Sequence, residues 1–255
     1  MPLPNRWLTA LLIRYNGRKL LIDCGEGTQI TLKMLGWGFK TIDTICFTHY
    51  HGDHVTGLPG LLLTIGNSGR IEPITLVGPP GLKKVVEGLT VVAPELPFEI
   101  EYIELSEEEV LEKDFKIDII KDLSVKIVPV EHTVPCFAYV IELQRRPKFN
   151  PEKALNLKIP TEFWKVLQRG ESVRWNEHYY TPDMVLGEQR NGLKVAYCTD
   201  SRPVFELAAS IYKADLFICE GMYGDEEDKV QAQKNKHMTF LEAADLAKKG
   251  EVGEL

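Results

Sequence analysis

Short apolar runs rich in β-branched residues alternate along the chain with polar loops and with segments whose apolar positions recur at helical spacing. The apolar runs predict strands at residues 8–13, 19–22, 44–48, 74–77, 98–105, 115–119, 124–130, 137–143, 194–198 and 215–219. Helical spacing predicts helices at residues 28–34, 58–65, 82–89, 204–212 and 239–250, the last opened by a capping box and closed by a glycine. Turns are predicted at Asn16 and Gly17 and at Lys121 and Asp122. Strands interleaved with helices indicate an α/β fold.

Residues 145–191 interrupt this rhythm between two strands with short helical stretches, prolines and glycines. Basic residues, among them Arg146 and Lys153, are interleaved there with aromatic residues such as Trp164 and Tyr179. In RNA-binding proteins Lys and Arg neutralise phosphates, and aromatic rings stack on unpaired bases. The segment is therefore predicted to be an inserted substrate-contact excursion. A solvated loop with its own small core is the alternative.

The composition is that of an ordinary globular protein, and 255 residues suffice for one large α/β domain. The sequence shows no apolar run long enough to cross a bilayer and no charged-then-apolar leader, so a cytoplasmic protein without membrane contact is expected. The five cysteines form no closely spaced pair, which favours buried reduced thiols over zinc ligands. A net charge of −7 is unusual for a polyanion-binding protein, so an RNA substrate would require locally concentrated positive charge and metal ions.

The densest chemical signal is the string His-Tyr-His-Gly-Asp-His at residues 49–54, directly after a predicted strand. Histidines that are packed for bulk do not gather in this way. Imidazole nitrogens together with a carboxylate oxygen suit zinc and related first-row ions. Gly52 is expected to let the backbone turn so that the ligands on both sides of it converge. The string therefore predicts a metal site.

The pattern H-x-H-x-D-H resembles the signature of the metallo-β-lactamase superfamily. The resemblance implies an αββα four-layer sandwich with the metal site at an edge where strand ends converge. It also implies a lone histidine after a later strand, matched by His132, and a bridging aspartate after a further strand, matched by Asp200. Asp23, in an early glycine-containing loop, matches the aspartate that supports the ligands.

On this resemblance the cofactor is a pair of zinc ions, with manganese or another divalent ion as the alternative. One metal would be held by three histidines, the second by Asp53 and His54, and Asp200 would bridge both; the three histidines are His49, His51 and His132.

Several further strings resemble the ribonuclease Z family, whose members trim the 3′ ends of tRNA precursors. They lie at residues 2–6, 23–29, 131–135 and 236–239, and a weaker likeness joins Arg146 and Lys153 to that family's substrate loop. The resemblance implies an endoribonuclease that removes the 3′ trailer from tRNA precursors and is typically a homodimer. It assigns Asp53 as the residue that orients or deprotonates water, His237 as the acid for the leaving oxygen, and Glu220 as the partner of His237.

The sequence departs from the family pattern in two places. The family carries a last histidine on the second metal after the final helix, whereas no histidine follows His237 here. We therefore expect residues 1–255 to be a single domain cut short at both ends, or a chain with an incomplete second site. In addition, Ile159, Pro160 and Thr161 stand where the family has a glycine-proline arm that grips tRNA, and the glycine is missing.

Two other functions compete with this interpretation. One is a general metallo-phosphodiesterase or 3′ exonuclease of the same superfamily, which the acidic net charge favours. The other is a metal-binding scaffold without catalytic activity, for which the absent last histidine is the only indication.

Overall fold

The computed structural model describes residues 3–113, 115–120, 122–224 and 226–255. Met1, Pro2 and Lys121, which belong to the predicted family string and the second predicted turn, lie outside the described residues. The chain divides into two compact units. The first unit combines Met1–Glu142 with Lys194–Leu255, and the second is Leu143–Leu193.

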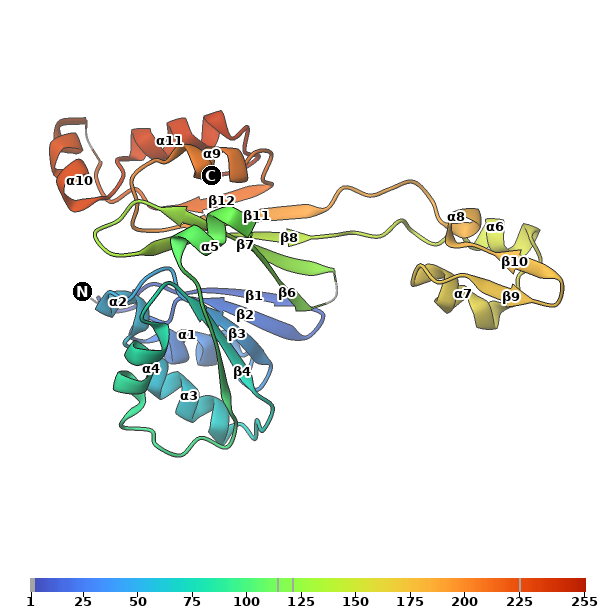
Figure 1. Ribbon diagram of the computed structural model, residues 1–255, viewed down its shortest axis with the longest axis horizontal. Coiled ribbons are helices and arrows are strands. Elements are labelled where there is room, and N and C mark those ends of the chain that lie inside the picture. Colours follow the sequence, from blue (N-terminus) through green and yellow to red (C-terminus); the bar gives the residue numbers. More distant parts are fainter. Residues whose placement is uncertain (1–2, 114, 121, 225) are drawn as a thin grey trace. The chain divides into compact units, whose positions relative to one another are not determined.

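The first unit contains two five-stranded sheets that face each other, with helices on both outer sides (Figure 1). One sheet has the strand order β1-β2-β3-β4-β5, with β1 and β2 antiparallel and the remaining pairs parallel. Its strands are β1 (Leu11–Tyr15), β2 (Arg18–Ile22), β3 (Ile42–Cys46), β4 (Ile74–Gly78) and β5 (Ile100–Glu104). The helices on its outer face are α1 (Thr28–Leu35), α3 (Leu58–Asn67) and α4 (Leu82–Thr90).

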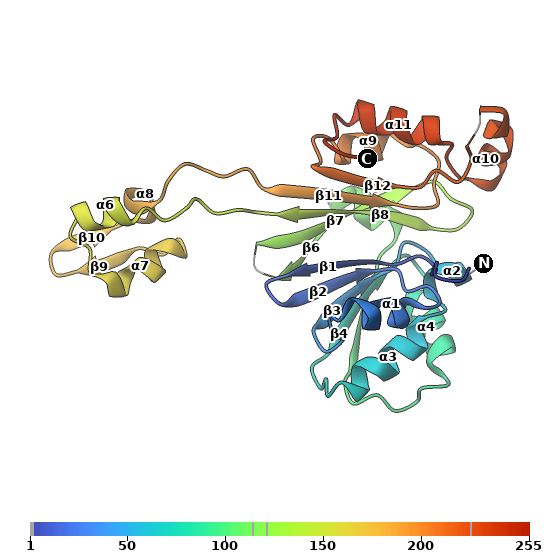
Figure 2. The ribbon, with the colours of Figure 1, turned by 180° about the vertical axis from the view of Figure 1, so that it is seen from behind.

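The other sheet has the strand order β12-β11-β8-β7-β6. Its strands are β6 (Lys116–Ile120), β7 (Leu123–Val130), β8 (Cys136–Leu143), β11 (Leu193–Cys198) and β12 (Leu216–Cys219). On its outer face lie α9 (Phe205–Ser210) and α11 (Phe240–Lys249), as both ribbon views show (Figure 2). The four layers agree with the αββα sandwich expected from the sequence.

Each sheet has an apolar core against its own helices. Leu21 and Ile45 of the first sheet pack in one buried cluster with Leu61 of α3, and Val140 and Ala196 of the second sheet cluster with helical residues such as Leu246. The sheets are also tied together across the sandwich, because the Tyr139 hydroxyl donates to the carbonyl of Phe47 at 2.6 Å. This bond fixes β8 beside the end of β3, where the metal-binding string begins.

The second unit has a small core of its own, formed by Ala154, Ile159, Leu167, Tyr180 and Val185. Its elements are α6 (Pro151–Asn156), α7 (Thr161–Gln168), the hairpin β9 (Val173–Trp175) with β10 (His178–Tyr180), and α8 (Pro182–Val185).

Several elements differ from the sequence-based prediction. β1 begins at Leu11 rather than at residue 8, because Leu8 and Thr9 form backbone hydrogen bonds with the loop that carries Gly25 and Glu26. Four short helical segments of the first unit were not predicted, since segments of so few residues give little periodicity. They are α2 (Gly52–Val55), α5 (Glu107–Lys113), the 3-10 turn η1 (Glu226–Asp228) and α10 (Lys229–Asn235).

All five cysteines are free thiols, and four of them are buried, as expected from their spacing. Among the described residues, no helix combines the length and apolar character needed to cross a membrane.

Candidate metal centre

The candidate ligands follow the carboxyl ends of strands from both sheets. His49 follows β3, His132 follows β7 and Asp200 follows β11, while His54 lies in the short helix α2. The helix also reaches back to the early loop, because the carbonyl of His54 accepts a hydrogen bond from Cys24 N at 2.7 Å. The two sheets thus deliver all six predicted ligands to one cluster.

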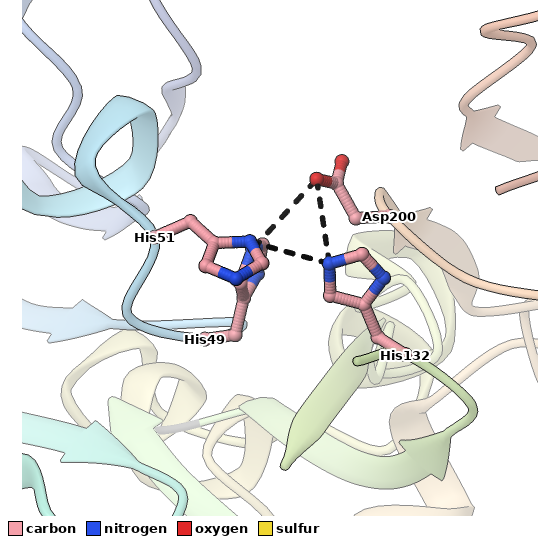
Figure 3. Close-up of side chains that lie close together, drawn as sticks. All are labelled: His49, His51, His132 and Asp200. Carbon is pink, nitrogen blue, oxygen red and sulfur yellow. Dashed lines mark hydrogen bonds and ion pairs between the residues drawn. The ribbon is translucent and has the colours of Figure 1, made fainter. Parts of the chain in front are cut away.

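The first ligand group consists of three histidines and Asp200, whose polar atoms point toward a common centre (Figure 3). His51 Nδ1 lies 3.0 Å from His49 Nε2 and 3.3 Å from His132 Nε2. Asp200 Oδ2 lies 3.7 Å from His49 Nε2 and 3.9 Å from His132 Nε2. Ligand atoms bound to one tetrahedral zinc ion stand about 3.3 Å apart. The four atoms are therefore spaced as the ligands of a single ion would be.

The second group is Asp53, His54 and Asp200. His54 Nε2 is buried and has no hydrogen-bond partner among the described residues. It lies 3.8 Å from Asp53 Oδ2 and 3.7 Å from Asp200 Oδ2, beyond hydrogen-bond length. A buried polar atom without a partner destabilises a fold, and a cation among these three atoms would supply the missing interaction. Because Asp200 Oδ2 faces both groups, this donor set fits two ions that share one carboxylate.

Asp23 and Thr48 hold the ligands from behind. The fully buried carboxylate of Asp23 lies 2.9 Å from His54 Nδ1 and accepts a hydrogen bond from Thr48 N at 2.8 Å. The Thr48 hydroxyl lies 2.9 Å from Asp23 Oδ2 and 3.1 Å from His49 Nδ1. These contacts occupy the Nδ1 atoms of both histidines, so each ring presents Nε2 to the cluster.

The electrostatics of the cluster favour one positive charge between its carboxylates. Burial lowers the pKa of His54, but the carboxylates of Asp200 and Asp23 outweigh burial and raise it to about 10. Burial and the neighbouring His54 together lower the pKa of His49 to about 2. Burial opposes ionisation of Asp200, yet the interactions with His54 and His49 hold its pKa below the usual range. The carboxylates that raise the pKa of His54 would also attract a divalent cation.

The two predicted catalytic partners lie against the same cluster. Glu220 directly follows β12, and its Oε2 lies 2.9 Å from His237 Nδ1. Its Oε1 accepts a hydrogen bond from Ser201 N at 2.6 Å, and burial raises the pKa of Glu220. Both residues approach Asp200 closely enough to form a third group of potential ligands. The rings of His132 and His237 are 5.3 Å apart.

The other predicted residues are placed differently. Asp53 is half exposed, with 51% of its side chain accessible, so its carboxylate is open to water. Arg146 and Lys153 belong to the second unit, where both donate to backbone carbonyls. Lys153 Nζ lies 3.1 Å from the carbonyl of Leu186, and Arg146 bonds to the carbonyl of Arg169. Both side chains therefore contact the backbone of their own unit.

Thr48 and the glycines around the cluster add to the sequence-based site. Thr48 was not predicted, although its place directly before the histidine string is a usable signal. Gly52 does not have the expected role: it begins α2, and an added Cβ would make only an ordinary 3.6 Å contact. Glycine is instead required at Gly25 and Gly57, where two backbone segments approach each other closely. A Cβ added at Gly25 would collide with the carbonyl oxygen of Asp53, and one added at Gly57 would collide with the carbonyl oxygen of Gly25.

Comparison with known proteins agrees with this geometry. Residues 9–142 match the family model of the metallo-beta-lactamase superfamily. The chain is 57% identical to a ribonuclease Z of Clostridium kluyveri and 55% identical to one of Clostridium acetobutylicum. Both alignments cover all of this chain and 82% of the relative. The short form of human tRNase Z has the same fold, with a TM-score of 0.70 at 24% identity over 98% of this chain and 85% of the human one. The chain therefore belongs to the ribonuclease Z family of the metallo-β-lactamase superfamily, a family of metal-dependent hydrolases.

Proposed function

We propose that this protein is an endoribonuclease that removes the 3′ trailer from tRNA precursors by hydrolysing one phosphodiester bond. The observation that carries the proposal is the position of Asp200 Oδ2, which lies 3.7 Å from both His49 Nε2 and His54 Nε2 and so connects the two ligand groups. The identity to curated ribonuclease Z sequences supports the choice of substrate.

We assign two zinc ions to the cluster, held by the residues of the two ligand groups. When bound, such ions lower the pKa of water and stabilise the negative charge that develops on the phosphate oxygens. Asp53 is the exposed carboxylate beside the cluster, and it orients the attacking water and accepts its proton.

The leaving 3′ oxygen requires a proton, and His237 is placed to donate it. Glu220 accepts a hydrogen bond from His237 Nδ1, which fixes the ring orientation and raises the basicity of the other nitrogen. Ser201 N holds the second carboxylate oxygen of Glu220, so the pair cannot rotate freely. Asp53 lies in α2 and His237 lies between α10 and α11, so the water-orienting carboxylate and the acid come from separate segments beside the same cluster.

We further propose that the second unit contacts the RNA and that the protein is a cytoplasmic homodimer. Residues 143–193 carry nine Lys and Arg against six Asp and Glu, whereas the whole chain has a net charge of −7. This local excess of positive charge supports a role in binding phosphates.

The test uses the zinc-loaded protein, a tRNA precursor with a 3′ trailer, and the small diester bis-p-nitrophenyl phosphate. We expect a single cut after the discriminator base and its loss in Asp53→Ala. Hydrolysis of the small diester without a discrete cut in the precursor would instead identify a general phosphodiesterase. Bound zinc without turnover of either substrate would identify a scaffold. Sedimentation of the same preparation tests the homodimer.

A further inference from the structure

Arg202 joins the two strand ends that carry metal ligands. It lies two residues after Asp200, and its backbone N–H donates to the carbonyl of Glu131 at 2.9 Å. Glu131 directly precedes His132, and Glu131 and Arg202 form an isolated antiparallel bridge. The backbone of Arg202 is therefore fixed relative to ligands from both β7 and β11.

The guanidinium group of Arg202 reaches a third segment, which carries His237. Its Nη1 donates to the carbonyl of His237 and lies 2.8 Å from Glu242 Oε2, while its Nη2 pairs with Glu242 Oε1. Only 11% of the Arg202 side chain and 12% of the Glu242 side chain are accessible. A bidentate pair with so little solvent exposure holds its geometry much better than a surface ion pair.

Glu242 is itself tied to the start of α11. It accepts from Thr239 N at 3.0 Å, and its own N–H donates to the Thr239 hydroxyl at 3.2 Å, which completes a capping box. Residues 236–242 are thus bonded at both ends. The carbonyl of Lys236 accepts from His132 Nδ1 at 3.1 Å, and Arg202 binds the carbonyl of His237 and the carboxylate of Glu242.

This segment needs such support because its backbone turns sharply. Lys236 has a φ of 60°, in the left-handed region that non-glycine residues rarely adopt. The turn places the His237 ring against Glu220, and a small displacement there would separate the acid from the leaving oxygen. Misplacement of a catalytic group by about 1 Å can lower a rate by roughly 100-fold.

We propose that Arg202 is a positioning residue that clamps the His237 segment to the end of β11 and so holds the general acid in place. The inference rests on the proposed function, in which His237 protonates the leaving oxygen. Lysine could not replace the clamp, because one ammonium group cannot bind a carboxylate in two places while also donating to a carbonyl.

The experiment compares the zinc-loaded parent protein with Arg202→Gln, with His237→Ala and with the double variant. The matched control is Arg18→Gln, because Arg18 also forms a bidentate pair, with Asp43, but in the other sheet. Each protein is assayed on precursor tRNA and on bis-p-nitrophenyl phosphate. Nitrophenolate departs without a proton, whereas the ribose oxygen needs one, so the ratio of the two losses reports on the acid.

We expect Arg202→Gln to lower kcat on the precursor about 10- to 100-fold more than kcat on the small diester, with unchanged zinc content. In the His237→Ala background the additional loss on the precursor should fall to less than about twofold, because residues that act through one group are not additive. Arg18→Gln should not change the ratio of kcat on the precursor to kcat on the small diester. Equal losses on both substrates, or a full additional loss in the double variant, would overturn the proposal.

A further measurement separates this inference from the proposed function. Amide hydrogen exchange in residues 236–242 should accelerate in Arg202→Gln and remain at the parent rate in Arg18→Gln. If the parent hydrolyses the diester but does not cut the precursor, the proposed function fails, and the exchange rates still decide whether the clamp exists. If Arg202→Gln does not fold, Glu242→Gln serves instead, because the one oxygen of glutamine can still accept from Thr239 N, whereas its amide nitrogen cannot accept from Arg202 Nη2.

Discussion

Replacement of Thr48 by valine should weaken metal binding although Thr48 is not itself a ligand. The Thr48 hydroxyl lies 2.9 Å from Asp23 Oδ2 and 3.1 Å from His49 Nδ1, in a fully buried position. Valine has nearly the same shape, so the substitution removes one hydroxyl group and opens no cavity. The change therefore isolates the hydrogen bonds that fix the two side chains.

The consequences differ for the two partners of Thr48. Asp23 keeps its bonds to Thr48 N at 2.8 Å and to His54 Nδ1 at 2.9 Å. Among the described residues, His49 Nδ1 keeps only a weak contact with Cys136 Sγ at 3.8 Å. Leaving a buried polar group unsatisfied costs about 1–3 kcal/mol. For a chain of this size each kcal/mol lowers Tm by about 2–4 °C. Loss of the partner behind a histidine ligand typically lowers metal affinity by about 10- to 100-fold.

The assay measures zinc affinity by competition with a chromophoric chelator and Tm by calorimetry of the metal-free protein. Thr48→Ser retains the hydroxyl and should bind zinc nearly as the parent does. Thr75→Val is the matched control, because the Thr75 hydroxyl donates to Glu101 at 3.1 Å in a solvent-exposed bond away from the cluster. If Thr48→Val bound zinc as tightly as Thr75→Val, the hydroxyl would have no part in orienting His49, and the reasoning would be wrong.

Three further results are expected. Removal of zinc by a chelator should lower Tm by about 5–10 °C, because a ligand at 100 times its Kd stabilises the folded state by about 2.7 kcal/mol. An unchanged Tm in calorimetry would contradict a preformed site. Replacement of Leu143–Leu193 by a short Gly-Ser link should raise KM for precursor tRNA about 10-fold more than KM for bis-p-nitrophenyl phosphate. The reason is that this unit has its own core and a local excess of positive charge. Equal changes in both KM values would show that the unit serves the fold rather than RNA binding. Burial raises the pKa of Cys24 and Cys46 and so suppresses their thiolates; Ellman's reagent should label at most the partly exposed Cys219 rapidly in the native protein and all five cysteines after unfolding.

The structure brings the six residues of the predicted ligand cluster together, and the strongest part of that prediction is local. Four of the predicted ligands lie within six residues, and their identity alone indicates a metal. His132 and Asp200 could be selected only through the family resemblance, since nothing within their own segments distinguishes them from loop residues. The structure supplies the missing reason: β7 and β11 belong to one sheet and end beside each other's ligands, as the bond from Arg202 N to Glu131 O demonstrates.

Other features could not be read from the sequence because they depend on tertiary contacts. Thr48 is one of many strand threonines, and its importance comes only from the buried Asp23 that it contacts. Arg202 is separated from Glu242 by 40 residues, so no local pattern reveals the pair. The expected role of Gly52 failed for the opposite reason, because a local turn was inferred where the chain forms the short helix α2.

The distribution of charge connects the metal cluster to the binding of RNA. Residues 143–193 have a net charge of +3, so the remainder of the chain carries −10. Within that remainder, three carboxylates belong to the candidate ligand groups, those of Asp53, Asp200 and Glu220, and a fourth, that of Asp23, lies buried behind His54. A phosphate could not approach such a group without opposing charge, because burial strengthens the repulsion. Two divalent cations bring four positive charges, which offset those carboxylates. We therefore expect metal binding to be a condition for substrate binding at the cluster as well as for the hydrolysis itself.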